Sequence, residues 1–160
     1  MGAAPLDSTA VAAVDSSAQV ADILEGTVGT AFAERAGDGY LVVEQSVDSR
    51  GRIIPSALVE HGCVIGEGAR IGGRVVLESG VMVGANTTIE RAVVMRGAEI
   101  GEHCTLSGCI VGGGGRIGDH THIEGMSVLG EGVTIGAGNV IANGARIFPG
   151  VELPDGAILF

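Results

Sequence analysis

An aliphatic residue returns at every sixth position of the chain, from Ile53 almost to the C-terminus. A period of six fits neither the 3.6-residue turn of an α-helix nor the two-residue alternation of an ordinary strand. It is typical of a parallel β-helix, in which each hexad forms one short side of a coil. The aliphatic positions are Ile53, Val59, Ile65, Ile71, Leu77, Val83, Ile89, Val94, Ile100, Leu106, Val111, Ile117, Ile123, Leu129, Ile135, Ile141, Ile147, Leu153 and Leu159.

A second, smaller position accompanies each aliphatic, four residues further along the chain. A narrow triangular coil needs this pairing, because a large side chain fills the interior and a small one lies near each corner. Glycine fills many positions between them and adopts positive φ without a Cβ clash. With three hexads in a coil, the repeat predicts about six coils. The predicted small positions are Ala57, Cys63, Ala69, Val75, Val81, Thr87, Val93, Ala98, Cys104, Ile110, Gly115, Thr121, Ser127, Val133, Asn139, Ala145, Val151 and Ala157.

The repeat loses one residue twice, between Ile89 and Val94 and between Leu106 and Val111. With three hexads in each coil, both short steps fall on the same side of neighbouring coils. We therefore expect the two deletions to stack at one corner and keep the coils in register. The glycine run at residues 112–115 follows the second short step. We interpret it as a tight corner rather than a phosphate-binding loop, because no Gly-Lys-Ser/Thr and no predicted helix follow it.

Residues 1–52 do not follow the repeat and form a separate segment from the β-helix domain predicted over residues 53–160. Alanine-rich spacing at three and four predicts a helix over residues 8–24, and residues 30–35 are predicted to form a second short helical turn. Residues 40–44 have the composition of a strand. We expect this mostly helical segment to cap the open end of the β-helix. The alternative is a linker to a partner domain.

Composition excludes several classes of protein. The net charge is −10 and all nine basic residues are arginine, so no basic stripe is present to bind nucleic acid. No apolar stretch is long enough to span a membrane and the N-terminus lacks a signal peptide, so we expect a cytoplasmic location. Cys63 and Cys104 fall on different sides of the coil. We expect both to be structural thiols in a reducing compartment rather than a disulfide.

Histidines are the candidate residues for chemistry. His103 and His120 hold the same hexad position one coil apart, which places their Cα atoms about 5 Å apart on one outer face. With His122 they resemble a metal site, but no third ligand is obvious, so we predict a solvated ladder without metal or cofactor. The competing hypothesis is an acyltransferase whose general base is His61, His103 or His120. We assign no catalytic residue, because the chain lacks an extruded loop and a basic patch for coenzyme A. His103 and His120 remain the weak candidates of that alternative.

Several segments of the second half of the chain resemble the C-terminal β-helix of bacterial sugar-nucleotide pyrophosphorylases, and above all that of mannose-1-phosphate guanylyltransferases. The resemblance extends over roughly residues 53–160. It implies that the β-helix is left-handed and that it mediates oligomerisation, or allosteric control, beside a catalytic domain. The segments are RAVV at 91–94, GAEIGEHC at 97–104, GCIVG at 108–112, ARIFPGV at 145–151 and LPDG at 153–156.

The catalytic domain of that family carries a Gly-x-Gly-Thr-Arg-Leu loop, a metal-binding aspartate and essential lysines. The loop is absent from this sequence, which has no lysine at all. The resemblance therefore implies a non-catalytic assembly or regulatory module of a sugar-1-phosphate nucleotidylyltransferase, with no activity in this chain alone. A stand-alone acyltransferase and a purely structural scaffold are the alternatives.

Two partners follow from this hypothesis. One is a nucleotidyltransferase catalytic domain. The other is a second or third copy of the chain, because exposed aliphatic residues on one flat face of a β-helix would pack against the same face of another copy. We expect this dimer or trimer face to include Val75, Val76, Val93 and Met95.

Overall fold

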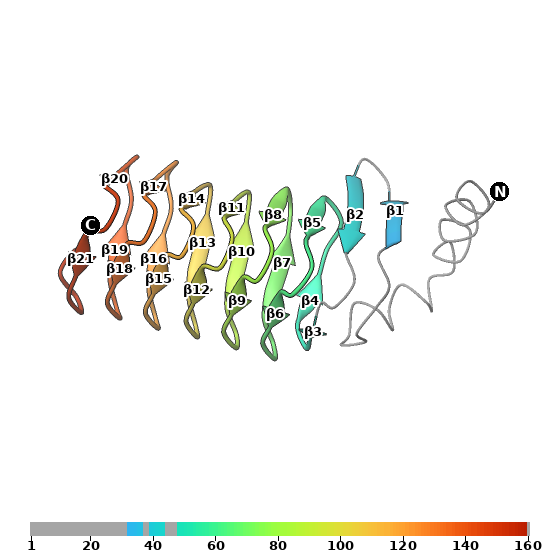
Figure 1. The fold of residues 1–160 in the computed structure, drawn as a ribbon, viewed down its shortest axis with the longest axis horizontal. Helices are drawn as coiled ribbons and strands as arrows, with labels where there is room; N and C mark the ends of the chain where they lie inside the picture. The colour runs from blue at the N-terminus through green and yellow to red at the C-terminus, as the bar shows by residue number, and fades with distance from the viewer. Residues whose placement is uncertain (1–31, 37–38, 44–47, 160) are drawn as a thin grey trace.

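The structure of the chain, a computed structural model, describes residues 32–36, 39–43 and 48–159. These residues form 21 short strands and no helix. The strands stack into a single elongated row of coils (Figure 1). The architecture is a parallel β-solenoid of about six turns, so the fold class predicted by the hexad repeat is confirmed. Among the described residues no helix is long and apolar enough to cross a membrane.

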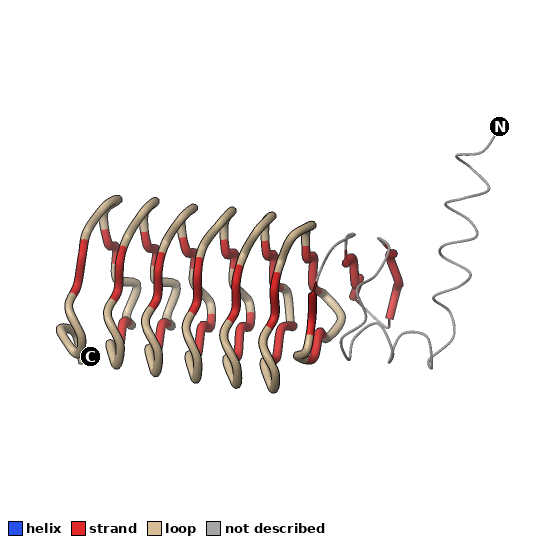
Figure 2. The backbone as a smooth tube through the Cα atoms, turned by 60° about the horizontal axis from the view of Figure 1, so that its bottom comes forward, coloured by secondary structure: helices blue, strands red, loops and turns tan. Residues whose placement is uncertain are grey.

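Each coil contributes one strand to each of three sheets, and the strands form the sides of the coil while turns form its corners (Figure 2). Sheet A contains β1 (Phe32–Ala36), β2 (Gly39–Val43), β5 (Ala57–Val59), β8 (Val75–Leu77), β11 (Val93–Val94), β14 (Ile110–Val111), β17 (Val128–Leu129) and β20 (Arg146–Ile147). Sheet B contains β3 (Asp48–Ser49), β6 (Val64–Ile65), β9 (Met82–Val83), β12 (Glu99–Ile100), β15 (Arg116–Ile117), β18 (Thr134–Ile135) and β21 (Glu152–Leu153). Sheet C contains β4 (Arg52–Ile53), β7 (Arg70–Gly72), β10 (Thr88–Glu90), β13 (Thr105–Ser107), β16 (His122–Ile123) and β19 (Val140–Ile141).

The N-terminal edge of sheet A is covered by a hairpin. β1 pairs antiparallel with β2, and β2 pairs in parallel with β5. The strand predicted over residues 40–44 is therefore confirmed. The short helical turn predicted over residues 30–35 is wrong, because hydrogen bonds to β2 provide the ladder that a short isolated helical turn lacks. The helix predicted over residues 8–24 lies outside the described residues.

The interior is a stack of aliphatic side chains from all three sheets. Strand pairing places each inward residue directly over its counterpart in the next coil, as in Ile53, Ile71 and Ile89. Most of the predicted aliphatic positions are buried. The last one is wrong: Leu159 is 68% exposed, because no described coil covers it.

The two short steps of the repeat stack at the corner between sheets C and A, as predicted. β10 pairs with β13 and β11 pairs with β14, so the shortened corners lie in neighbouring coils. The deletion changes which residue points inward. Ala92 and Cys109 are 1% and 3% exposed and fill the small interior position, whereas Val93 and Ile110 point outward. The prediction of Val93 and Ile110 as small interior residues is therefore wrong, because the missing residue lies before the small position.

Candidate functional site

His103 and His120 stack as predicted, at the corner between sheets B and C. Their rings are parallel within 2° and their centroids are 5.0 Å apart. Both residues adopt the left-handed conformation, with φ of 54° and 57°, which histidine tolerates better than most residues. Both side chains are exposed to solvent. The stack is thus a solvated ladder in its geometry.

The other histidines do not complete a site with this pair. His122 begins β16 and is exposed on the outer face of sheet C, and His61 lies at a different corner, between sheets A and B. In the described part of the chain, no group of three or more His, Cys, Asp or Glu residues is arranged to hold a metal ion. Open hollows of about 390, 400, 500 and 760 Å³ lie on the described surface, and no histidine lines these hollows.

Cys63, Cys104 and Cys109 are all buried. Cys63 and Cys104 occupy the small interior position, as predicted, and Cys109 joins them because of the shortened corner. Burial raises the pKa of the Cys109 thiol to about 12. Burial is also the largest cause of the raised pKa of Cys104. Because the thiolate is the nucleophilic form, these thiols are poor candidates for catalysis near neutral pH.

The buried polar side chains at the corner between sheets B and C are structural. Thr87 donates a hydrogen bond to the carbonyl of Gly101 at 2.7 Å, and Asn139 accepts one from the Ile158 amide at 2.8 Å. Among the described residues no buried polar side-chain atom lacks a partner. A fully satisfied ladder of this kind ties neighbouring coils together and leaves no polar group aimed at a ligand.

The outer face of sheet A is the one continuous apolar surface of the described strands. Register places Leu58, Val76, Val93, Ile110 and Val128 directly beside one another in five successive coils, the outer row of sheet A. Four of these side chains are half-buried and Ile110 is 38% exposed. The row ends where Arg146 follows Val128.

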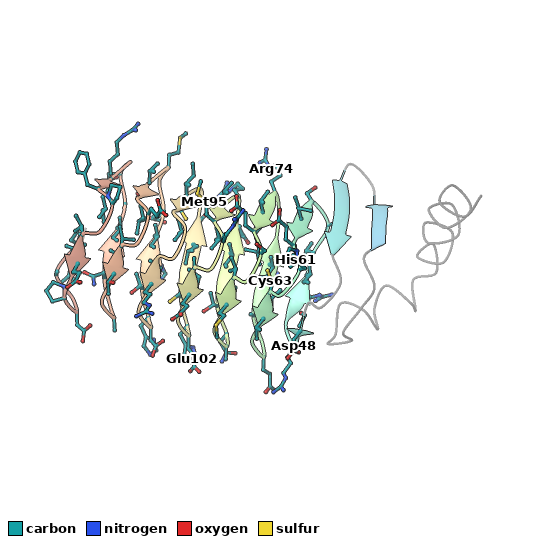
Figure 3. All side chains as sticks on the ribbon, viewed as in Figure 1. Asp48, His61, Cys63, Arg74, Met95 and Glu102 are labelled. Carbon is teal, nitrogen blue, oxygen red and sulfur yellow. The ribbon has the colours of Figure 1, made fainter. Side chains whose placement is uncertain are left out.

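The sequence identified this face only in part. Val76 and Val93 belong to the outer row, and Met95 is exposed at its edge (Figure 3). Val75 was predicted to lie on the same face, which is wrong because it is 1% exposed and points into the interior. Adjacent strand residues alternate between the two faces of a sheet, so Val75 and Val76 cannot both point outward. Val128 was missed, although the period of the repeat would have located it, and Ile110 was missed because the repeat predicted it to lie in the interior.

Two hollows flank the outer row. The first, of about 760 Å³, lies over the glycine run at residues 112–114, with Met95 on its rim. The second, of about 500 Å³, lies at the shortened corner and includes Met126, which is 82% exposed. The glycine run is a tight corner, as predicted: a Cβ at Gly112 would lie 2.5 Å from the carbonyl carbon of Gly130, and Gly114 has a φ of 64°.

Comparison with known structures gives matches to hexapeptide transferases. A mutant of GDP-perosamine N-acetyltransferase from Caulobacter crescentus is 23% identical, covering 65% of this chain and 52% of the other, with a TM-score of 0.47. The acetyltransferase domain of PglB from Neisseria gonorrhoeae is 25% identical, covering 65% and 54%, with a TM-score of 0.45. A hexapeptide transferase family protein from Anaplasma phagocytophilum is 28% identical, covering 68% and 72%, with a TM-score of 0.44. This chain thus spans about half the length of the first two proteins.

Comparison with the curated proteins gives no match. A family model does match: the GMPPB C-terminal domain, which is the hexapeptide-repeat β-helix region of GDP-mannose pyrophosphorylase B, aligns with residues 53–156. This match agrees with the resemblance in the sequence and supports the left-handed β-helix that it implies. Since the model covers most of the chain and the solenoid that the structure shows, the protein belongs to the family of the GMPPB C-terminal domain.

Proposed function

We propose that this β-helix is a non-catalytic module that assembles a sugar-1-phosphate nucleotidylyltransferase similar to mannose-1-phosphate guanylyltransferase. The catalytic domain would belong to the same polypeptide or to a separate subunit. Copies of the β-helix associate as a dimer or trimer through the outer row of sheet A. The observation that carries this proposal is the unbroken apolar row on a member of a nucleotidyltransferase-associated family.

The outer row has the composition of an interface core. Such cores are depleted in charged residues, and they favour large apolar side chains such as methionine and aromatics. The outer row contains no charged residue, and Met95 and Met126 lie in the hollows on its two sides. The alternating ridge and hollows allow side chains from another copy to interlock with the row, which a flat polar sheet does not allow.

A second copy suits this face because of the charge of the chain. With a net charge of −10, two copies repel each other over much of their surfaces. The outer row itself carries no carboxylate, and the carboxylates of Glu78 and Glu131 line the hollow on one side of it. Symmetric association also needs a patch that complements itself, and an uncharged aliphatic ridge meets that requirement.

Sedimentation velocity at micromolar concentration tests the assembly. We expect the wild-type chain to sediment as a dimer or trimer and Ile110→Arg to sediment as a monomer, because it places a charge at the centre of the apolar row. Thr105→Arg is the matched control, since it adds the same charge to the outer face of sheet C. Circular dichroism spectra should be the same for all three. A monomeric wild-type chain, or an Ile110→Arg variant that still assembles, would contradict the proposal.

A direct assay tests the non-catalytic part of the proposal. The chain incubated with GTP, mannose-1-phosphate and Mg²⁺ should release no pyrophosphate. Release of pyrophosphate by the purified chain alone would show that the β-helix itself is the enzyme.

A further inference from the structure

A cluster of arginines surrounds a hollow at the corner between sheets C and A. The hollow has a volume of about 390 Å³, and three arginines line it, Arg70, Arg74 and Arg91, together with the single acidic residue Glu90. Three arginines and one glutamate leave a surplus of two positive charges. This surplus is local, because the chain as a whole carries a net charge of −10.

The first shortened corner creates this hollow. The full-length corner has Gly73 and Arg74 between Gly72 and the interior residue Val75, whereas the next corner has only Arg91 between Glu90 and the interior residue Ala92. The edge of the solenoid therefore steps inward by one residue from one coil to the next. The two corners are joined by a hydrogen bond of 3.0 Å from the Arg91 amide to the Gly73 carbonyl, so the arginines belong to adjacent layers.

Arg74 and Arg91 adopt backbone conformations that arginine seldom takes. Their φ values are 70° and 49°, in the left-handed region where most corners of this chain use glycine. At the next coil the same corner position is Gly108, with a φ of 62°. The backbone conformation therefore favours glycine or asparagine at this corner. It does not explain why arginine occupies the corner in two neighbouring coils. Ser56 and Met126 adopt the same conformation at corners between sheets C and A, each with a φ of 64°, so the guanidinium groups rather than the backbone distinguish the two arginine corners.

The guanidinium groups of Arg70 and Arg74 are not neutralised within the described part of the chain. The ion pair found there joins Arg116 to Glu99, 3.7 Å apart on sheet B. Arg91 donates a hydrogen bond of 2.8 Å to the Ser107 hydroxyl, which ties its guanidinium to the next coil. Arg74 projects outward from the corner, away from the interior (Figure 3).

We propose that this corner binds the phosphate group of a small phosphorylated ligand, a nucleotide or a sugar phosphate. The planar guanidinium group matches phosphate oxygens with two parallel hydrogen bonds, and three arginines around one hollow surround a single diphosphate. Glu90 accepts a hydrogen bond from a ligand hydroxyl, which both ligand classes carry. Arg91 also lines the hollow beside the outer row of sheet A, so this site borders the proposed assembly surface at that residue, whereas Arg70 and Arg74 line neither hollow beside the row.

Isothermal titration calorimetry at about 0.15 M salt tests this site, with pyrophosphate and GDP as the probes. We expect saturable binding of one ligand per chain for the wild type. In the double variant Arg74→Asn/Arg91→Asn the affinity should fall at least about tenfold, since two charge-assisted contacts are lost. Asparagine already occupies left-handed positions of this chain at Asn86 and Asn143, so the double variant is expected to fold normally.

Arg116→Gln is the matched control, because it removes one positive charge from another sheet and should leave the affinity unchanged. Absence of saturable binding would overturn the proposal. So would binding that the double variant retains, or binding that Arg116→Gln weakens as strongly, which would indicate only a general charge effect. Tighter binding of GDP than of pyrophosphate supports a nucleotide ligand, and equal binding supports recognition of the diphosphate alone. Sedimentation of the single variant Arg74→Asn separates this result from the assembly proposal, because Arg74 lines neither hollow beside the outer row and the oligomeric state should match that of the wild type.

Discussion

Sheets A and C have similar interiors and very different outer faces. Both present only Ile, Leu and Val as their large interior residues in the middle coils. Outside, sheet A presents the apolar outer row, whereas sheet C presents mainly polar and charged residues. The outer residues of sheet C are Arg52, Arg70, Thr88, Thr105, His122 and Val140.

This difference shows which face of the molecule is suited to bind a partner. Interior residues are fixed by close packing against the coils above and below, so every sheet converges on the same side chains. Outer residues are free of that constraint. Folding of a single stack of coils therefore does not require an apolar row on one outer face. Contiguous apolar patches of this kind mark interaction sites.

The largest expected effect comes from breaking the interior. Ile117 is 3% exposed in sheet B, so Ile117→Asp would bury an unpaired charge and should unfold the solenoid, at a cost above about 4 kcal/mol. Thermal unfolding followed by circular dichroism measures this. Glu102→Ala is the control, because Glu102 is exposed and its loss should shift the midpoint very little. A folded Ile117→Asp variant would contradict the assigned interior.

The shortened corner allows a sharper comparison between two adjacent residues. Ala92 fills the interior position and Val93 points outward, so Ala92→Leu should destabilise the fold by about 1–3 kcal/mol through overpacking. Val93→Leu should change the free energy of unfolding by less than about 0.5 kcal/mol. Urea unfolding of both variants measures the difference. Equal effects at the two positions would mean that the corner is assigned in the wrong register.

A smaller effect is expected from pH. The pKa of Cys109 is raised to about 12 in the fold, so between the ordinary thiol pKa and that value the unfolded chain loses a proton that the folded chain keeps. The free energy of unfolding should therefore fall as the pH rises above about 9, by at most about 1.4 kcal/mol per pH unit from this residue. Urea unfolding at several pH values measures the slope, and Cys109→Ala should make it shallower. An unchanged slope in that variant would show that Cys109 does not contribute.

The smallest effect is expected at the histidine ladder. His103→Asn keeps a residue that tolerates the left-handed conformation, so the free energy of unfolding should stay within about 0.5 kcal/mol. The same variant tests the acyltransferase alternative. We expect no turnover of acetyl coenzyme A by the wild type. Turnover that is lost in His103→Asn or His120→Asn would favour that alternative instead.

The period of the repeat predicts much of this molecule. A hexad count assigns each residue to a sheet and a coil, which is why the stacked deletions and the paired rings of His103 and His120 were predictable. The position of a deletion within a corner is not encoded in that count. The repeat therefore placed Val93 and Ile110 in the interior, and it did not show that Ala92 and Cys109 take their place.

The candidate sites depend on relationships that span several coils. Arg70 and Arg74 come from one coil and Arg91 comes from the next, and only the stacking of a full corner on a shortened one brings them around one hollow. The outer row of sheet A likewise joins residues that lie 17 or 18 positions apart in the sequence. Similarly, the strand β1 exists through its pairing with β2, which local propensity in residues 30–35 did not indicate.

The sequence by itself determined the β-solenoid and most of its large interior residues, because a six-residue period permits few other ways to bury so many aliphatic residues. Its C-terminal segments at residues 145–151 and 153–156 indicated the family. Tertiary structure decided which outer residues become neighbours. That choice depends on strand register and on the exact corner where a residue is missing, and both are properties of coils stacked in space rather than of any one hexad.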